Sequence, residues 1–92
     1  MYTMSAKLTF HISYADSLKE KRKVCRSIID KTKKRFNVSV AEVDMQDAHR
    51  TLTIGIAIVS GELGHARESL DKIINFMEEH AEAELVGVEE FL

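Results

Sequence analysis

Apolar and polar residues alternate along the first part of the chain. Apolar residues occupy every second position and polar residues stand between them: Met4, Ala6, Leu8, Phe10, Ile12 and Tyr14. A period of two places these side chains on one face of an extended strand. The pattern predicts a half-buried β-strand over residues 3–14.

A helix is predicted from Ser17 to about Arg35. Its first residues form a capping box, in which Ser17 and Glu20 can each accept a hydrogen bond from the other's backbone N–H. Lys21 and Arg35 fall inside or beside the apolar arc, so we expect their side chains to extend along it toward water. At 100° per residue this arc spans about 140° and holds Leu18, Val24, Cys25, Ile28, Ile29 and Phe36.

Two strands joined by a loop are predicted next. The segment FNVSVAEVD, residues 36–44, has the second strand's pattern, and its phase slips at Glu42, which indicates a β-bulge. Residues 44–50 are predicted to form the hairpin loop. The third strand, residues 51–60, places four apolar side chains on one face: Leu52, Ile54, Ile56 and Ile58.

The last two predicted elements are a helix after Ser60 and Gly61 and a strand over residues 84–92. The apolar face of this helix holds Leu63, Ala66, Leu70, Ile73, Ile74 and Met77. The order β-α-β-β-α-β, with two right-handed split crossovers, predicts an α+β fold of the ferredoxin-like type. Its four-stranded antiparallel sheet would carry both helices on one face. Residues 1–92 contain no proline and no linker, so we expect one domain.

Composition narrows the class of protein. The chain is 45% hydrophobic and 30% charged, as in ordinary globular domains. No apolar run reaches the roughly 18 residues of a membrane span, and the N-terminus lacks the apolar block of a signal peptide. The single cysteine, Cys25, excludes an intramolecular disulfide. We therefore expect a cytoplasmic protein without membrane contact.

The formal net charge of −2 conceals a strong asymmetry. Residues 17–35 hold nine basic and two acidic side chains, whereas residues 61–92 hold two basic and nine acidic ones. Such a concentration of cations predicts contact with RNA phosphates or another anionic partner. Alternatively, the cations are solvated or paired with acids of the second helix, at Glu68, Asp71, Glu78 and Glu79. Six cations fall in one stripe of about 120° beside the apolar arc, here called the basic stripe: Lys19, Arg22, Lys23, Arg26, Lys33 and Lys34.

Two other surfaces carry candidate residues. The hairpin loop gathers Asp44, Gln46, Asp47 and His49, which could bind a hard cation. Acidic residues in a turn more often bond to the nearby backbone. The outward positions of the second and third strands are small and partly apolar, which is typical of a face that docks a second copy: Ala41, Val43, Gly55, Ala57 and Val59.

The sequence lacks the common motifs of catalysis and cofactor binding. It has no paired thiols, no histidines three or four residues apart and no Gly-rich phosphate loop. The outward positions of the central strands hold no aromatic residue on which RNA bases would stack. We therefore expect no catalytic residues, no cofactor, no metal ion and no enzyme. A metal-dependent enzyme at the Asp44–His49 loop is the least favoured reading.

Three segments resemble the YlxP-like family of small bacterial proteins of unknown function: DSLKEKRKV, RFNVSVAEVDMQD and IGIAIVS. The resemblance spans nearly the whole chain and implies a ferredoxin-like domain. Genes of this family often lie beside those of an initiation factor and a ribosome-binding factor, which implies a role linked to the ribosome or to RNA. The family often has Trp-Gln-Arg where this chain has His49, Arg50 and Thr51.

These observations lead to one main hypothesis and one alternative. The main hypothesis is a non-enzymatic module that contacts ribosomal RNA or a ribosomal subunit through the basic stripe. The alternative is a self-associating scaffold, a homo-oligomer that uses the outward sheet face and binds no nucleic acid.

Overall fold

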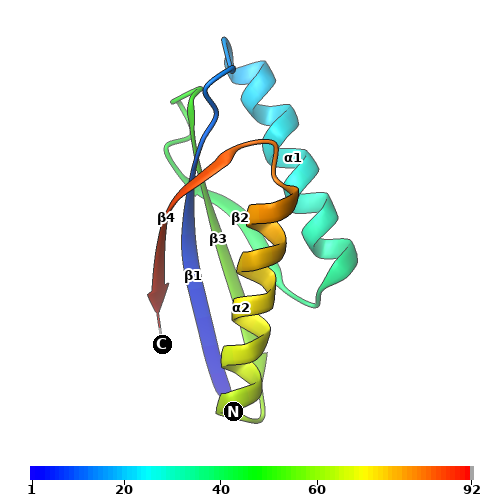
Figure 1. The fold of residues 1–92 in the computed structure, drawn as a ribbon. Helices are drawn as coiled ribbons and strands as arrows, with labels where there is room; N and C mark the ends of the chain where they lie inside the picture. The colour runs from blue at the N-terminus through cyan, green and yellow to red at the C-terminus, as the bar shows by residue number, and fades with distance from the viewer. Residues whose placement is uncertain (92) are drawn as a thin grey trace.

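The computed structural model describes residues 1–91 and contains a four-stranded sheet with two helices (Figure 1). Neighbouring strands are all antiparallel, in the order β2-β3-β1-β4. This confirms the predicted ferredoxin-like arrangement. Leu92, the last residue of the predicted fourth strand, lies outside the described residues. The elements are β1 Tyr2–His11, α1 Leu18–Arg35, β2 Ser39–Asp44, β3 Thr51–Ser60, α2 Leu63–His80 and β4 Glu84–Phe91.

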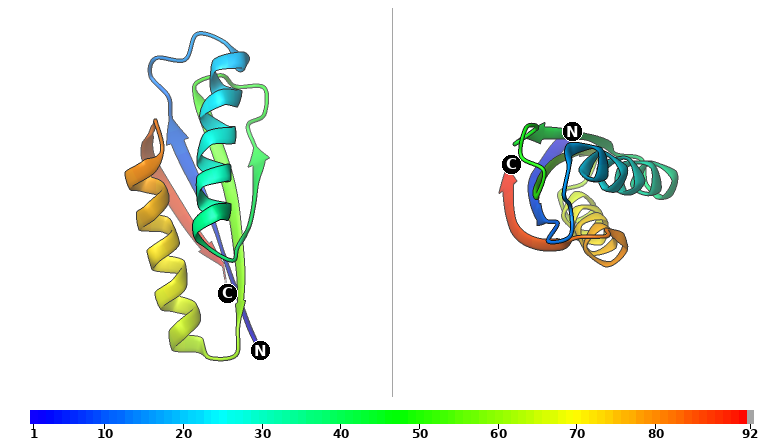
Figure 2. Two further views of the ribbon diagram at one scale, coloured as in Figure 1. Left: turned by 90° about the vertical axis from the view of Figure 1, so that its right-hand side faces the viewer. Right: turned by 90° about the horizontal axis from the view of Figure 1, so that it is seen from above.

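Both helices cover the same face of the twisted sheet and leave the other face open (Figure 2). α1 lies against β2, and α2 lies against β1 and β3. The edge strands are β2 and β4, each with one neighbour. α1 therefore packs against an edge strand of the sheet.

The core lies between the helices and the covered face of the sheet. The register of β1 and β3 places Leu8 opposite Ile54 and Phe10 opposite Leu52, and all four side chains are fully buried. Each such side chain contributes about 1.5–3 kcal/mol to stability through burial. The helices complete the core with Val24, Cys25, Ile28, Ala66, Leu70, Ile73 and Met77.

α1 begins at the predicted cap, and one of the two bonds of the predicted capping box is present among residues 1–91. Ser17 has an extended backbone, and its Oγ accepts a hydrogen bond from the Glu20 N–H at 3.2 Å. The Phe36 N–H donates to the Thr32 carbonyl at 2.9 Å and ends the helix. Phe36 therefore belongs to the end of α1, and β2 starts three residues later than predicted, at Ser39.

Two residues assigned to buried faces are in fact exposed. Tyr14 is 51% exposed because β1 ends at His11, before the predicted end of the strand. Its hydroxyl donates to the Glu82 carbonyl at 2.5 Å, on the segment between α2 and β4. Leu63, the first residue of α2, is 52% exposed and lies before the first buried position of the helix, Ala66.

The predicted bulge in β2 is present. The register of β2 against β3 shifts between Glu42 and Asp44. Glu42 stays on the helix side of the sheet, opposite the buried Ile54, and Val43 lies on the open face. There the Val43 side chain covers Gly55, where an added Cβ would stand only 2.8 Å from Val43 Cγ1. A larger residue at position 55 would therefore require the Val43 side chain to shift.

Candidate nucleic-acid interface

All six residues of the basic stripe are exposed on α1. Within residues 1–91, none of them has an acidic side chain within 4.0 Å. Two of the four acids of α2 pair inside their own helix, Glu68 with Lys72 at 3.5 Å and Asp71 with Arg67 at 3.9 Å, and Glu78 and Glu79 form no ion pair within residues 1–91. The cross-helix pairing that was an alternative for the stripe is therefore not formed among these residues.

The orientation of α1 explains the missing pairs. Arg22 and Arg26 of the stripe line a groove between α1 and β2. Arg35, outside the stripe, lines a different groove together with Lys72 and Phe76 of α2. The stripe thus lies on the flank of α1 that faces away from α2, beyond the reach of the acids there. Its charges are either solvated or available to a partner.

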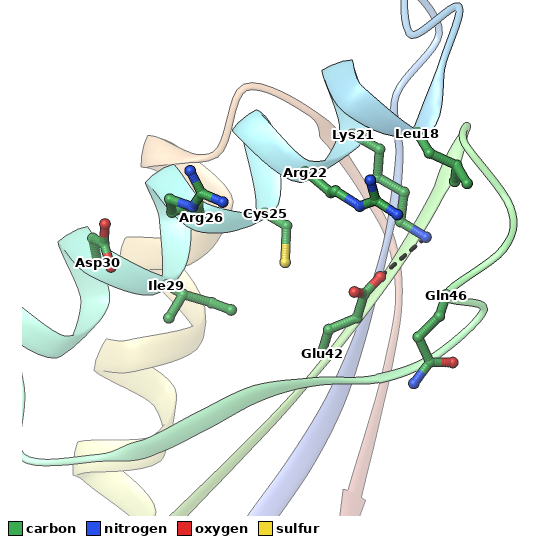
Figure 3. Close-up of a pocket in the computed structure, with 9 residues that line it drawn as sticks. All are labelled: Leu18, Lys21, Arg22, Cys25, Arg26, Ile29, Asp30, Glu42 and Gln46. Carbon is green, nitrogen blue, oxygen red and sulfur yellow. Dashed lines mark ion pairs between the residues drawn. The ribbon is translucent and has the colours of Figure 1, made fainter.

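The groove between α1 and β2 has a volume of about 280 Å³ (Figure 3). Cys25 and Ile29 project into it from α1, and Glu42 projects from β2 toward the helix. Gln46, from the hairpin loop, lines its other end. The groove therefore combines an apolar wall with polar groups from both sides. Its helix side consists of Leu18, Lys21, Arg22, Cys25, Arg26, Ile29 and Asp30.

The expectation that the Lys21 side chain extends toward water is wrong. Its side chain is 2% exposed, so it does not extend into water. The ammonium donates to the carbonyl oxygens of Met45 at 2.5 Å and Ala48 at 2.7 Å. It also lies 3.0 Å from Oε2 of Glu42, a buried oxygen that this ion pair compensates. The ammonium group therefore has two carbonyl acceptors and one anionic neighbour, whose Oε2 receives no hydrogen bond.

This arrangement joins α1 to β2 and to the hairpin loop, and so holds together the two sides of the groove. Two irregularities in the sequence indicate that such a contact is needed: a lysine lies inside an apolar arc, and a glutamate lies on the covered face of a strand. Neither by itself identifies the partner. A buried charge must be paired because its desolvation is otherwise very costly.

The hairpin loop is held in shape by hydrogen bonds to its own backbone. Met45 has a left-handed φ of 56°, and its N–H donates to Asp44 Oδ1 at 2.8 Å. The Ala48 N–H donates to the Met45 carbonyl at 3.1 Å. Over residues 1–91, no three His, Cys, Asp or Glu side chains gather in a way that could hold a metal ion. Asp47 and His49 are exposed, and Gln46 alone of the four candidate loop residues reaches the groove.

Cys25 is a buried, unreactive part of the groove wall. Burial, and then the nearby Glu42 carboxylate, raise the pKa of its thiol above the ordinary value, against smaller opposing effects of Lys21 and Arg26. The thiol is therefore neutral at pH 7 and acts as a small apolar side chain.

The open face of the sheet holds the residues assigned to self-association. Ala41, Val43 and Val59 are exposed, and Gly55 and Ala57 are half-buried. A shallow groove of about 320 Å³ crosses this face from β2 to Phe91 of β4. The face is not purely apolar, because Lys7 and Glu89 form an ion pair across it at 3.8 Å.

Taken together, these features describe a ferredoxin-like domain with a basic helix face beside a groove, and the cations of this face have no acidic side chain within 4.0 Å among residues 1–91. Residues 3–90 match the family described as "Protein of unknown function (DUF503)", and the chain belongs to this family. The chain is 36% identical over 70 residues to "Uncharacterized protein YlxP" of Bacillus subtilis strain 168, covering 76% of each protein. This confirms the YlxP-like resemblance.

A solved structure supports the fold alone. The designed protein LFR1 1, with a ferredoxin fold determined by solution NMR, aligns with a TM-score of 0.57 and 16% identity. The alignment covers 99% of this chain and 84% of the designed one. In addition, neither helix of residues 1–91 has the length and apolarity needed to cross a membrane.

Proposed function

We propose that this protein is a non-enzymatic RNA-binding module that contacts ribosomal RNA or a ribosomal subunit through the basic stripe of α1. The observation that carries the proposal is the absence of acidic partners around all six stripe cations within residues 1–91. Exposed cations without internal partners keep their full attraction for phosphates, and they release counterions when they bind.

The dimensions of the stripe suit a nucleic acid backbone. From Lys19 to Lys34 the helix rises about 22 Å at 1.5 Å per residue. In double-stranded DNA each strand carries one phosphate per about 3.4 Å of helix axis, so the stripe is long enough to contact several phosphates of one strand. Nine of the fifteen acidic residues lie in residues 61–92, away from the stripe, and therefore do not oppose this contact directly.

The salt dependence of binding tests the proposal. If about four stripe residues meet phosphates, the logarithm of the affinity for single-stranded RNA should fall with the logarithm of salt concentration with a slope near −3. Fluorescence anisotropy with labelled ribosomal RNA fragments gives this slope. Co-sedimentation with ribosomal subunits at increasing salt tests the proposed partner.

A charge-reversed variant with a matched control identifies the surface. Arg22→Glu, Arg26→Glu and Lys33→Glu together should abolish binding and leave the buried face of α1 intact. The control combines Lys31→Glu, Arg35→Glu and Lys72→Glu, which change the net charge equally on surfaces outside the stripe. Equal binding by wild type and the stripe variant would refute the proposal. Equal losses in both variants would show that total charge, and not the stripe, governs binding.

The open sheet face supports a second candidate function, self-association. Val43, Val59 and Phe91 are 48%, 66% and 45% exposed there. Exposed apolar residues in one patch are typical of interfaces. Light scattering across a range of concentrations measures the oligomeric state, and Ala57→Glu should convert any oligomer to monomers. A monomeric wild type at high concentration would exclude this function.

A further inference from the structure

We infer that the groove between α1 and β2 receives unpaired bases, so that the RNA bound by the stripe is single-stranded at this point. This inference rests on the proposed function, because the stripe supplies the phosphate contacts. The groove and the stripe share two residues, Arg22 and Arg26. A strand whose phosphates meet these guanidinium groups would therefore hold its bases directly beside the groove.

The size of the groove favours a base over a duplex. Its volume of about 280 Å³ is at the low end of sites for small molecules, which are roughly 300–1,000 Å³. One flat ring system can enter such a space, but a double helix cannot. Bases in A-form RNA are also paired and stacked inside the double helix. The major groove of this helix is deep and narrow, so side chains cannot reach the bases through it.

The side chains that line the groove favour a base inside it and phosphates at its rim. Leu18, Cys25 and Ile29 offer apolar contact to the face of a ring. Asp30 and Glu42 also line the groove and would repel a phosphate inside it, which leaves phosphates at the arginine rim. Carboxylates accept hydrogen bonds from amino groups of bases. The carboxylates therefore favour a base in the groove.

Two further groups can read the edge of a base. The Gln46 side chain offers both a donor and acceptors at the end of the groove. Glu42 of β2 supplies the other group, a carboxylate that lines the groove and can accept hydrogen bonds from the edge of a base. Lys21 fixes the distance between these groups and the helix through its contacts with Glu42 and the loop.

Binding of one labelled RNA in two forms tests the inference. The probes are a short unstructured RNA and the same strand annealed to its complement, compared by anisotropy at equal salt. Wild type should bind the single strand about tenfold more tightly, which corresponds to about 1.4 kcal/mol. Ile29→Trp, which fills the groove, should remove this preference and keep the salt dependence supplied by the stripe.

A second variant tests the inference independently of whether Ile29→Trp folds correctly. Gln46→Ala changes an exposed loop residue and should lower single-strand affinity about threefold or more without affecting duplex binding. Asn75→Ala, an exposed amide on α2, is the control and should change neither affinity.

The outcomes separate this inference from the proposed function. Equal affinity for the two RNA forms, or an unchanged preference in both Ile29→Trp and Gln46→Ala, overturns the inference and leaves the stripe proposal standing. Affinity that is insensitive to reversal of the stripe charges overturns the proposed function, and the inference falls with it.

Discussion

The two helices have the same length and similar amphipathicity, but their cations have different surroundings. On α2, Arg67 lies 2.6 Å from Glu90 of β4, and Lys72 lies 3.5 Å from Glu68. On α1, Lys21 is the one cation with an acidic partner within 4.0 Å among residues 1–91. The number of charges on a helix therefore does not measure the charge that a partner meets. The charge that a partner meets depends on which other elements lie next to each flank of the helix.

The comparison also separates two kinds of cation on α1 itself. Lys21 is buried and contacts two carbonyl groups and the Glu42 carboxylate, whereas the stripe cations are exposed and have no ion pair in the part of the chain that the structure describes. The former contributes to the stability of the fold, and the latter are available for binding. Substitutions on α1 should accordingly fall into two groups, with large effects on stability or on binding but not on both.

The largest effect on stability is expected for Lys21→Ala. It leaves the Glu42 carboxylate without its cation and two carbonyl groups without their donor, and breaking a buried ion pair in this way costs about 3–5 kcal/mol. Chemical denaturation followed by circular dichroism measures the loss. The matched control is the exposed Lys23→Ala, which should change stability by less than about 0.5 kcal/mol. Similar losses in the two variants would remove the distinction between buried and stripe cations.

An intermediate effect is expected at the helix caps. Ser17→Ala removes the bond to the Glu20 N–H and should cost about 0.5–2 kcal/mol. The corresponding residue of α2, Glu62, makes no side-chain cap bond, so Glu62→Ala should have a smaller effect. Thermal melts of both variants measure the difference. An unchanged melt for Ser17→Ala would contradict the assigned start of α1.

The smallest effect concerns Tyr14, which joins the segment before α1 to the segment after α2. Burial, followed by the charges of Glu82 and Glu20, raises the pKa of its phenol above 10.0. The folded state thus favours the protonated phenol, and this contribution to stability is fully present below pH 10.0 and lost as pH rises through the higher folded pKa. Tyr14→Phe should flatten the decline of stability above pH 10.0, measured by denaturation at several pH values. The control Tyr2→Phe removes the chain's other phenol and should leave that decline in place.

Much of the fold could be predicted because local patterns record which face of each element is buried. The alternation in residues 51–60 matches the bounds of β3, and the phase slip at Glu42 matches the bulge. Predictions failed at the ends of elements. Tyr14 and Leu63 continue the apolar pattern of their neighbours. A pattern does not show, however, where a strand ends or which of its apolar residues pack against another element.

The sequence by itself determined the order of the elements, the faces that form the core and the gathering of cations on one helix. Only the tertiary structure decided which of those cations are available. Lys21 and Glu42 are 21 positions apart, and their pairing depends on how closely α1 approaches β2. The same approach forms the groove and turns the stripe away from α2. Periodicity acts within one element, whereas the desolvation and pairing of a charge depend on atoms that folding brings together from different elements.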